Sequence, residues 1–368
     1  MHRIITPEQL HQTVEAAVRQ RSARYSDSHS LSLRWERDDT LAHQDTGHFQ
    51  SLLQTLHLPE AQELVIAATD KTPGWTVQGA FREILATAKQ TRGRALVVFH
   101  YADHGLQDDE CLYFAECQGG RRLNSTTFIM NMVMADWGYE LGDDDKVDIL
   151  FLFDCCYSHV ACRAPTTTQR IVEIIAATGE AAPLAFCPPR NTVTAKLAGE
   201  IRCRQRDGHK YVEFADIVEA LRARPDAVKR PTHCLKMGAM SISLPLSGAM
   251  TTKMNPEPIH PPLRVVFSAH IPGHVTPNEL REFVNWIQSL PEYASIVLEG
   301  VYPTSSTLFV LSAPWSVWSK LSGMYGYTFM TEVRGTNMLR QLPAGSGGSP
   351  KKKNIPFSQG FAYAEQGL

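Results

Sequence analysis

Apolar and polar positions follow a layered pattern along residues 30–247. Three continuous apolar runs, at 63–69, 95–101 and 148–153, have the length of strands and lack polar alternation. Between these runs, apolar residues recur at helical spacing. Strands that are apolar on both faces need a covering layer on each side. The pattern therefore predicts an α/β fold, a mostly parallel sheet with helices on both faces.

A different order of elements follows toward the C-terminus. Residues 248–262 are rich in Pro, Met and Thr, which is typical of a linker. The sequence from Thr276 to Glu279 is a capping box and predicts the start of a helix. Strand-like runs lie on either side of it, beginning at Leu263 and ending near Arg334. The predicted order is βαββαβ, a small α+β domain of ferredoxin-like arrangement.

These patterns predict five parts in the chain. A short amphipathic helix and a loop come first, and a Gly/Ser-rich, flexible tail comes last. The predicted parts are an N-terminal segment at 1–29, the main α/β domain at 30–247, a linker at 248–262, the ferredoxin-like domain at 263–343 and a tail at 344–368.

Composition narrows the class of protein. The formal net charge is −2, with 36 basic and 38 acidic residues, so charge gives no reason to expect nucleic acid or a membrane surface as a partner. The longest apolar runs are too short to cross a bilayer, and residues 1–19 lack the apolar core of a signal peptide. Eight cysteines without a CxxC pair are too sparse for a disulfide scaffold. We therefore expect a reduced, cytoplasmic protein.

Two of the predicted buried strands end in polar residues. His104 and Gly105 follow one of them, and Asp154, Cys155 and Cys156 follow the next. The carboxyl ends of parallel strands form the ligand-binding edge of such sheets. A thiol with a free pKa of about 8.5 is mostly un-ionised at neutral pH, and a neighbouring imidazole can activate it. A Cys–His pair predicts acyl transfer, and the backbone N–H groups of Gly105 and Cys156 are candidate oxyanion donors.

These motifs resemble the caspase–metacaspase clan, in particular fungal caspase-like domains of the metacaspase type. The resemblance covers roughly residues 30–247, and His104 precedes Cys156 by about 50 residues, as in caspases. It implies that His104 is the general base and that Cys156, not Cys155, is the nucleophile. It also implies that Asp154 lies on the floor of the first specificity pocket, where it selects Arg or Lys before the cleaved bond.

The resemblance further assigns the loop at 176–183 to the border of the substrate pocket, and with it Ala176 and Ala177. Two positions depart from the family. Asp103 stands before the His-Gly pair where a small residue is usual, and Tyr157 follows the nucleophile where His is usual. An anion at Asp103 would favour a protonated imidazole at His104.

An acidic run follows the predicted catalytic histidine. Asp108, Asp109 and Glu110 read either as a solvated turn or as calcium ligands, since calcium prefers clustered carboxylates and many metacaspases need it. No other cofactor is expected.

The sequence thus predicts a cysteine endopeptidase that cleaves protein or peptide substrates after basic residues. Family analogy places it in regulated cell death or stress signalling. A catalytically weak or inactive scaffold that binds protein partners is the first alternative. A metal or redox module around Cys156, His159 and Cys162 is the second. The sequence makes no prediction of oligomeric state.

Overall fold

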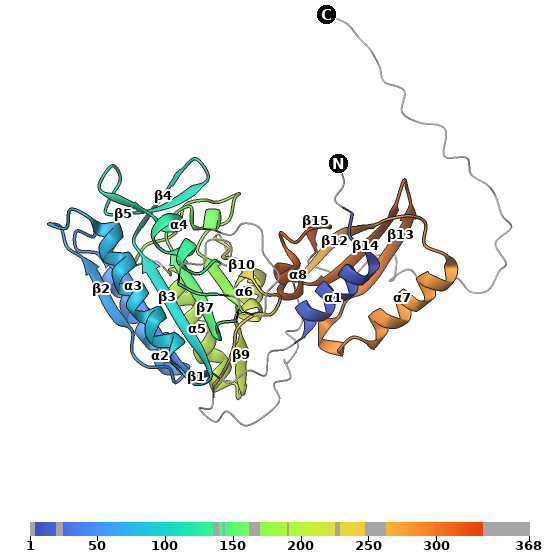
Figure 1. The fold of residues 1–368 in the computed structure, drawn as a ribbon, viewed down its shortest axis with the longest axis horizontal. Coiled ribbons are helices and arrows are strands. Elements are labelled where there is room, and N and C mark those ends of the chain that lie inside the picture. The colour runs from blue at the N-terminus through green and yellow to red at the C-terminus, as the bar shows by residue number, and fades with distance from the viewer. Residues whose placement is uncertain are drawn as a thin grey trace, which may run out of the picture. The chain divides into compact units, whose positions relative to one another are not determined.

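A six-stranded sheet forms the centre of the first two thirds of the chain (Figure 1). Its strands lie in the order β10-β8-β7-β3-β1-β2. Neighbouring strands are parallel from β2 to β8, and β10 runs antiparallel to β8. The bounds are β1 Tyr25–Trp35, β2 Gln62–Ile66, β3 Arg94–Ala102, β7 Val147–Asp154, β8 Val172–Ala176 and β10 Thr232–Met237. The predicted mostly parallel α/β sheet is confirmed.

These coordinates are those of a computed structural model. The structure describes residues 4–19, 25–134, 140–142, 144–161, 170–189, 191–224, 229–246 and 263–333. The predicted linker at 248–262 and the predicted tail at 344–368 lie outside the described residues, so both stay predictions. None of the helices in the described part of the chain is long and apolar enough to cross a membrane.

Helices cover both faces of this sheet, as the apolar strands require. Alternate residues of a strand point to opposite faces. On β3, Leu96 packs in one apolar cluster with the helices α2 and α5, while Phe99 packs in a second cluster with α3. Phe99 meets Phe81 of α3 edge to face, with 5.2 Å between the ring centroids. The helix bounds are α2 Ala42–Thr55, α3 Pro73–Lys89, α5 Val193–Arg206 and α6 Phe214–Ala223.

A small antiparallel sheet follows β3 directly. It is built from β4, β5 and β6, with β4 paired to β5 and β5 paired to β6. The chain leaves β3 at Asp103, whose φ is 148°, and enters β4 at His104. The bounds are β4 His104–Asp108, β5 Cys111–Ala115, β6 Arg122–Asn124 and the short α4 Ser125–Phe128, while β9 Tyr211–Glu213 pairs with β11 Ser243–Pro245.

The C-terminal elements follow the predicted βαββαβ order. The strands form a four-stranded antiparallel sheet in the order β13-β14-β12-β15. The capping box at Thr276 is present and begins α7. The bounds are β12 Arg264–Ile271, α7 Pro277–Ser289, β13 Val297–Pro303, β14 Thr307–Pro314, α8 Trp315–Leu321 and β15 Tyr327–Val333.

The N-terminal helix α1 (Pro7–Val18) packs against these C-terminal elements. Its Thr13 hydroxyl lies 2.5 Å from the hydroxyl of Tyr327, and Glu15 accepts a hydrogen bond from Trp286 Nε1 at 3.0 Å. Such contacts join residues about 300 positions apart, so no local pattern of the sequence predicts them.

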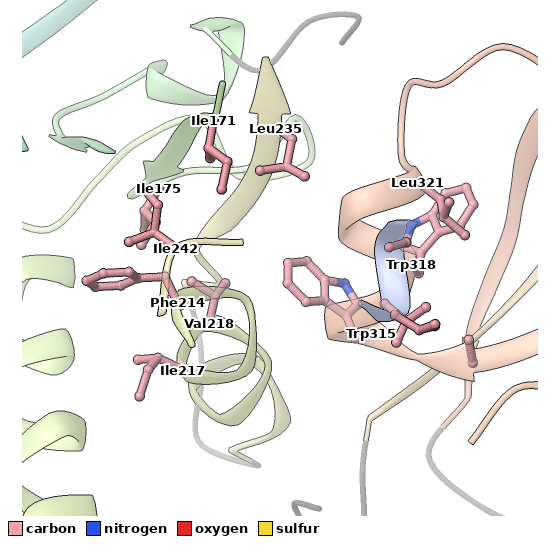
Figure 2. Packing of buried hydrophobic residues seen from close by; sticks show 14 of the residues in the cluster. Ile171, Ile175, Phe214, Ile217, Val218, Leu235, Ile242, Trp315, Trp318 and Leu321 are labelled. Carbon is pink, nitrogen blue, oxygen red and sulfur yellow. The ribbon is translucent and has the colours of Figure 1, made fainter. Parts of the chain in front are cut away.

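Helix α8 packs on α6 and β10 through Trp315, while Trp318 on its other side packs on Phe267 of β12 (Figure 2). Trp315 and Trp318 belong to the same buried apolar cluster as Val218 and Leu235. Polar contacts accompany them, since Ser316 N–H donates to Glu219 at 2.8 Å. Helix α8 thus contacts side chains of β10, including His233, whose Nδ1 lies 2.8 Å from Ser319 Oγ.

Candidate active site

The ends of β3 and β7 bring the predicted catalytic pair to one edge of the sheet. The two strands are parallel neighbours, and Ala102 stands opposite Asp154. His104 and Cys156 each follow two residues later. Gly105 approaches the second strand so closely that an added Cβ would lie 2.0 Å from the Cys156 carbonyl oxygen. The His-Gly pair and the nucleophile segment are thus in direct contact.

The main chain at His104 is held by buried neighbours. Its carbonyl oxygen accepts a hydrogen bond of 2.7 Å from the hydroxyl of Tyr101, whose ring stacks on Phe114. Its N–H donates to Asp103 Oδ1 at 2.7 Å. The imidazole is 26% exposed, and its Nε2 lies 2.5 Å from Asp39 Oδ1. A rigid backbone thus presents a half-buried imidazole at the edge of the sheet.

Asp103 does not interact with the imidazole as an anion would. Its carboxyl group is buried and accepts backbone hydrogen bonds from Trp35 and His104. Burial raises the pKa of Asp103 to about 8, against the lowering effect of the His104 N–H. The group is therefore mostly neutral at pH 7, and the expected bias toward a protonated imidazole at His104 does not arise from Asp103.

The two adjacent cysteines have different surroundings. Cys155 is 1% exposed and lies in the apolar core, where burial raises its pKa well above the ordinary value. Cys156 is partly exposed, and its Sγ accepts a hydrogen bond from Ala185 N–H at 3.3 Å. Burial also raises the pKa of Cys156, and that hydrogen bond works in the opposite direction. Of the two thiols, that of Cys156 is the more accessible.

A tight turn follows the nucleophile position. Tyr157 has a φ of 57°, in the left-handed region, and its N–H donates to Pro183 O at 2.6 Å. Among the described residues, the N–H of Cys156 has no hydrogen-bond acceptor in the protein. The fold thus leaves this N–H unused, and its role as an oxyanion donor stays a prediction.

His104 and Cys156 are not hydrogen-bonded to each other. Within the described part of the chain, the imidazole contacts Asp39 and the thiol contacts Ala185. Catalytic hydrogen bonds are often long in the absence of substrate and tighten only when it binds. The missing hydrogen bond therefore does not argue against the predicted pair, which stays a prediction.

Asp154 is buried at the end of β7, where it meets the beginning of α5. Its Oδ2 accepts a hydrogen bond from Thr194 N–H at 2.7 Å, and among the described residues its buried Oδ1 has no partner of good geometry, although Val193 and Thr192 also lie close enough to lower its pKa. Asp45 of α2 lies beside it and accepts a hydrogen bond from Thr192 Oγ1 at 2.5 Å. Burial raises the pKa of both groups, to about 8 for Asp45, where the charge of Asp154 adds to the effect. Two desolvated carboxyl groups thus share one site.

The predicted pocket residues Ala176 and Ala177 are both buried, and Ala177 N–H bonds to Phe153 O in the sheet. Their side chains lie in the core. The part of this loop that reaches Cys156 comes later, at Pro183 and Ala185. A role of this loop beside the nucleophile stays a prediction, and Pro183 and Ala185 are the residues that support it.

The acidic run is not gathered into a site. Asp108 forms an ion pair of 3.0 Å with Arg122, and Asp109 occupies a turn with a φ of 50°. The described residues contain no group of three or more Asp, Glu, His or Cys side chains that could hold a metal ion. Calcium binding by Asp108, Asp109 and Glu110 stays a prediction, and it would require the Asp108–Arg122 pair to break.

One candidate ligand of the alternative metal site, His159, makes hydrogen bonds within the protein. His159 Nδ1 lies 3.2 Å from Thr178 Oγ1, and its N–H donates to the same oxygen. Cys162 lies outside the described residues. His159 is therefore engaged with the loop after β8.

Sequence reasoning missed two acidic residues of the site, Asp39 and Asp45. The signal for Asp45 is a charged residue one turn before Phe49, on the apolar face of a predicted helix. Asp39 follows Asp38 directly after the first strand, the position where such sheets carry ligands. Neither signal indicates which residue Asp39 or Asp45 contacts. Only the folded structure shows these contacts.

Comparison with known proteins finds no matching family model and no matching curated protein. Among solved structures, the crystal structure of drICE is similar, with 11% identity and a TM-score of 0.36 over 58% of this chain and 90% of that one. Caspase-1 from Spodoptera frugiperda is similar with 13% identity and a TM-score of 0.37, over 59% of this chain and 89% of that one. Caspase structures are therefore among those that this chain resembles.

Proposed function

We propose that the protein is a caspase-like cysteine endopeptidase that cleaves protein or peptide substrates after Arg or Lys. The observation that carries this proposal is the approach of Gly105 to the Cys156 carbonyl, which brings His104 and an accessible thiol to one sheet edge. By family analogy, its setting is regulated cell death or stress signalling in the cytoplasm.

The reaction follows from the positions of these groups. His104 takes the proton of the Cys156 thiol, and the thiolate attacks the substrate carbonyl. The oxyanion accepts hydrogen bonds from the backbone N–H groups of Cys156 and Gly105. His104 then gives its proton to the leaving amine as the C–N bond breaks. Water attacks the remaining thioester with His104 as base, which releases the acid and restores the thiol.

The preference for a basic residue rests on the carboxyl pair. Within the described part of the chain, Asp154 Oδ1 is a buried acceptor without a partner of good geometry, and Asp45 adds a second carboxyl group nearby. A desolvated carboxylate is costly unless a cation pairs with it, and a guanidinium supplies both charge and donors. An Arg or Lys side chain of the substrate would compensate both groups.

Active-site labelling tests the proposed activity. A peptidyl acyloxymethyl ketone ending in Arg should alkylate Cys156 in the reduced, folded protein, as peptide mapping by mass spectrometry will report. The same reagent ending in Asp is the control and should label far more slowly. Folded protein that leaves both reagents unreacted would exclude a peptidase of this class.

Asp154→Asn should reduce the preference for Arg over citrulline, its neutral isostere, before the cleaved bond. A charge-assisted hydrogen bond is worth about 1.5–3 kcal/mol, so kcat/KM for the Arg substrate should fall roughly ten- to hundred-fold. Cleavage of the citrulline substrate should change little, which controls for damage to the fold. A wild-type enzyme that cleaves both substrates equally would refute the carboxylate pocket.

Binding of a cation at this pair should depend on pH. With a pKa of about 8, Asp45 is mostly neutral below that pH and ionised above it. A cation binds the ionised form, so affinity for agmatine should rise by up to about tenfold per pH unit toward pH 8 and then level off. Calorimetry on the Cys156→Ala protein in buffers of different ionisation enthalpy measures the released proton. Asp45→Asn should reduce this proton release, with Asp154 the remaining source, and release unchanged from the wild type would contradict the assignment to Asp45.

One observation favours a weak or inactive scaffold as the second candidate. Burial raises the pKa of the Cys156 thiol. A raised pKa reduces the fraction of thiolate at neutral pH. A scaffold would bind protein partners without cleaving them, and the labelling experiment separates the two candidates.

A further inference from the structure

Asp39 contacts the imidazole that the proposed mechanism needs. Its Oδ1 lies 2.5 Å from His104 Nε2, while the carboxylate is 71% exposed. Asp39 belongs to the segment between β1 and α2, and this segment is fixed on both sides of it. Asp38 Oδ1 accepts two hydrogen bonds of 2.7 Å from Thr40, one from its N–H and one from its hydroxyl.

The contact leaves one imidazole nitrogen without a partner. Among the described residues, His104 Nδ1 makes no hydrogen bond. A neutral imidazole carries its proton on one nitrogen, and the hydrogen bond at that nitrogen decides which. A carboxylate accepts hydrogen bonds but does not donate them when ionised. Asp39 therefore holds the proton at Nε2 and leaves the Nδ1 lone pair open.

We propose that Asp39 is a positioning residue that fixes His104 as the Nε2–H tautomer, so that Nδ1 receives the proton of the Cys156 thiol. The catalytic part of this inference rests on the proposed peptidase function. Asp39 also stabilises the imidazolium that forms when the thiol is deprotonated, as the aspartate of a catalytic triad does.

Two features separate this role from a purely structural one. An exposed ion pair contributes only about 0–1 kcal/mol to stability, so stabilisation of the fold does not account for this contact. The neighbouring acid Asp103 cannot replace it, because its buried carboxyl faces backbone N–H groups and is mostly neutral at pH 7. Asp39 is the carboxylate that reaches the ring.

The test compares Asp39→Ala and Asp39→Asn with the wild type. Asp39→Ala should lower kcat about ten- to hundred-fold and leave KM within about twofold, because the contact orients the base and does not bind substrate. Asp39→Asn keeps an acceptor for Nε2–H without the charge, so its kcat should lie between those of the wild type and of Asp39→Ala. Asp27→Ala is the matched control, since Asp27 is also exposed, although less than Asp39, and pairs with a histidine, His29, at 3.2 Å.

A second measurement does not need activity. ¹⁵N NMR of histidine-labelled protein, with His104 assigned through His104→Gln, should show the Nε2–H tautomer in the wild type and a mixture in Asp39→Ala. If the wild type cleaves no substrate, the peptidase proposal fails. The spectrum still shows whether Asp39 fixes the tautomer of His104. An Nδ1–H tautomer in the wild type, or unchanged kcat in Asp39→Ala, would overturn the role of Asp39.

Discussion

Cys156→Ala should leave no measurable peptide cleavage. Removing the nucleophile of a cysteine or serine peptidase eliminates the covalent route, and losses of about 10³-fold or more in kcat are expected. The partly exposed Cys156 thiol lies at the sheet edge with His104-Gly105, so no other group in the described site can replace it. Initial rates on an Arg substrate, after titration of active sites in the wild type, measure the loss.

Cys155→Ala is the matched control, since it removes the same atoms one position earlier. Cys155 points into the core, so this variant should keep a readily measurable rate. It should instead lower the free energy of unfolding by about 1 kcal/mol, since a buried sulfur leaves a small cavity. Equal loss of activity in both variants, or an active Cys156→Ala, would refute the assignment of the nucleophile.

The sequence predicts a strand best where the strand is buried and apolar on both faces. The run at 95–101 is apolar on both faces, and β3 extends from Arg94 to Ala102. β1 begins at Tyr25, and no continuous apolar run marks its first half, which contains Ser28 and Ser30, both buried. Backbone pairing with β3 stabilises this polar half. That pairing exists only in the folded sheet, so the residues of β1 alone do not indicate it.

The residues of the candidate site also differ in how far the sequence predicts them. His104, Gly105 and Cys156 are predictable, because a polar residue at the end of a buried strand is itself a signal. Asp39 and Asp45 come from the loop after β1 and from α2, and the folded sheet edge brings them to the site. Ala176 and Ala177 carry no signal of their own, and both are part of the core.

Gly105→Ala should damage the site more than any other single methyl group. The added Cβ would lie 2.0 Å from the Cys156 carbonyl oxygen and 2.9 Å from Cys155 Sγ. The first neighbour is backbone, so the end of one strand has to move away from the other. We expect a loss of kcat/KM of about a hundred-fold or more, because small displacements of catalytic groups have effects of this size. Overpacking should also cost about 1–3 kcal/mol in stability.

A double variant identifies which neighbour is responsible. Cys155→Ala in the Gly105→Ala background removes the sulfur but keeps the carbonyl, so it should restore little of the activity. Gly199→Ala is the control for a harmless methyl group, since its Cβ would meet nothing within 4 Å on α5. Thermal unfolding and kcat/KM on the Arg substrate provide the measurements. If Gly105→Ala behaved like Gly199→Ala in both, the ends of β3 and β7 would not approach as described, and the shared edge for His104 and Cys156 would be lost with it.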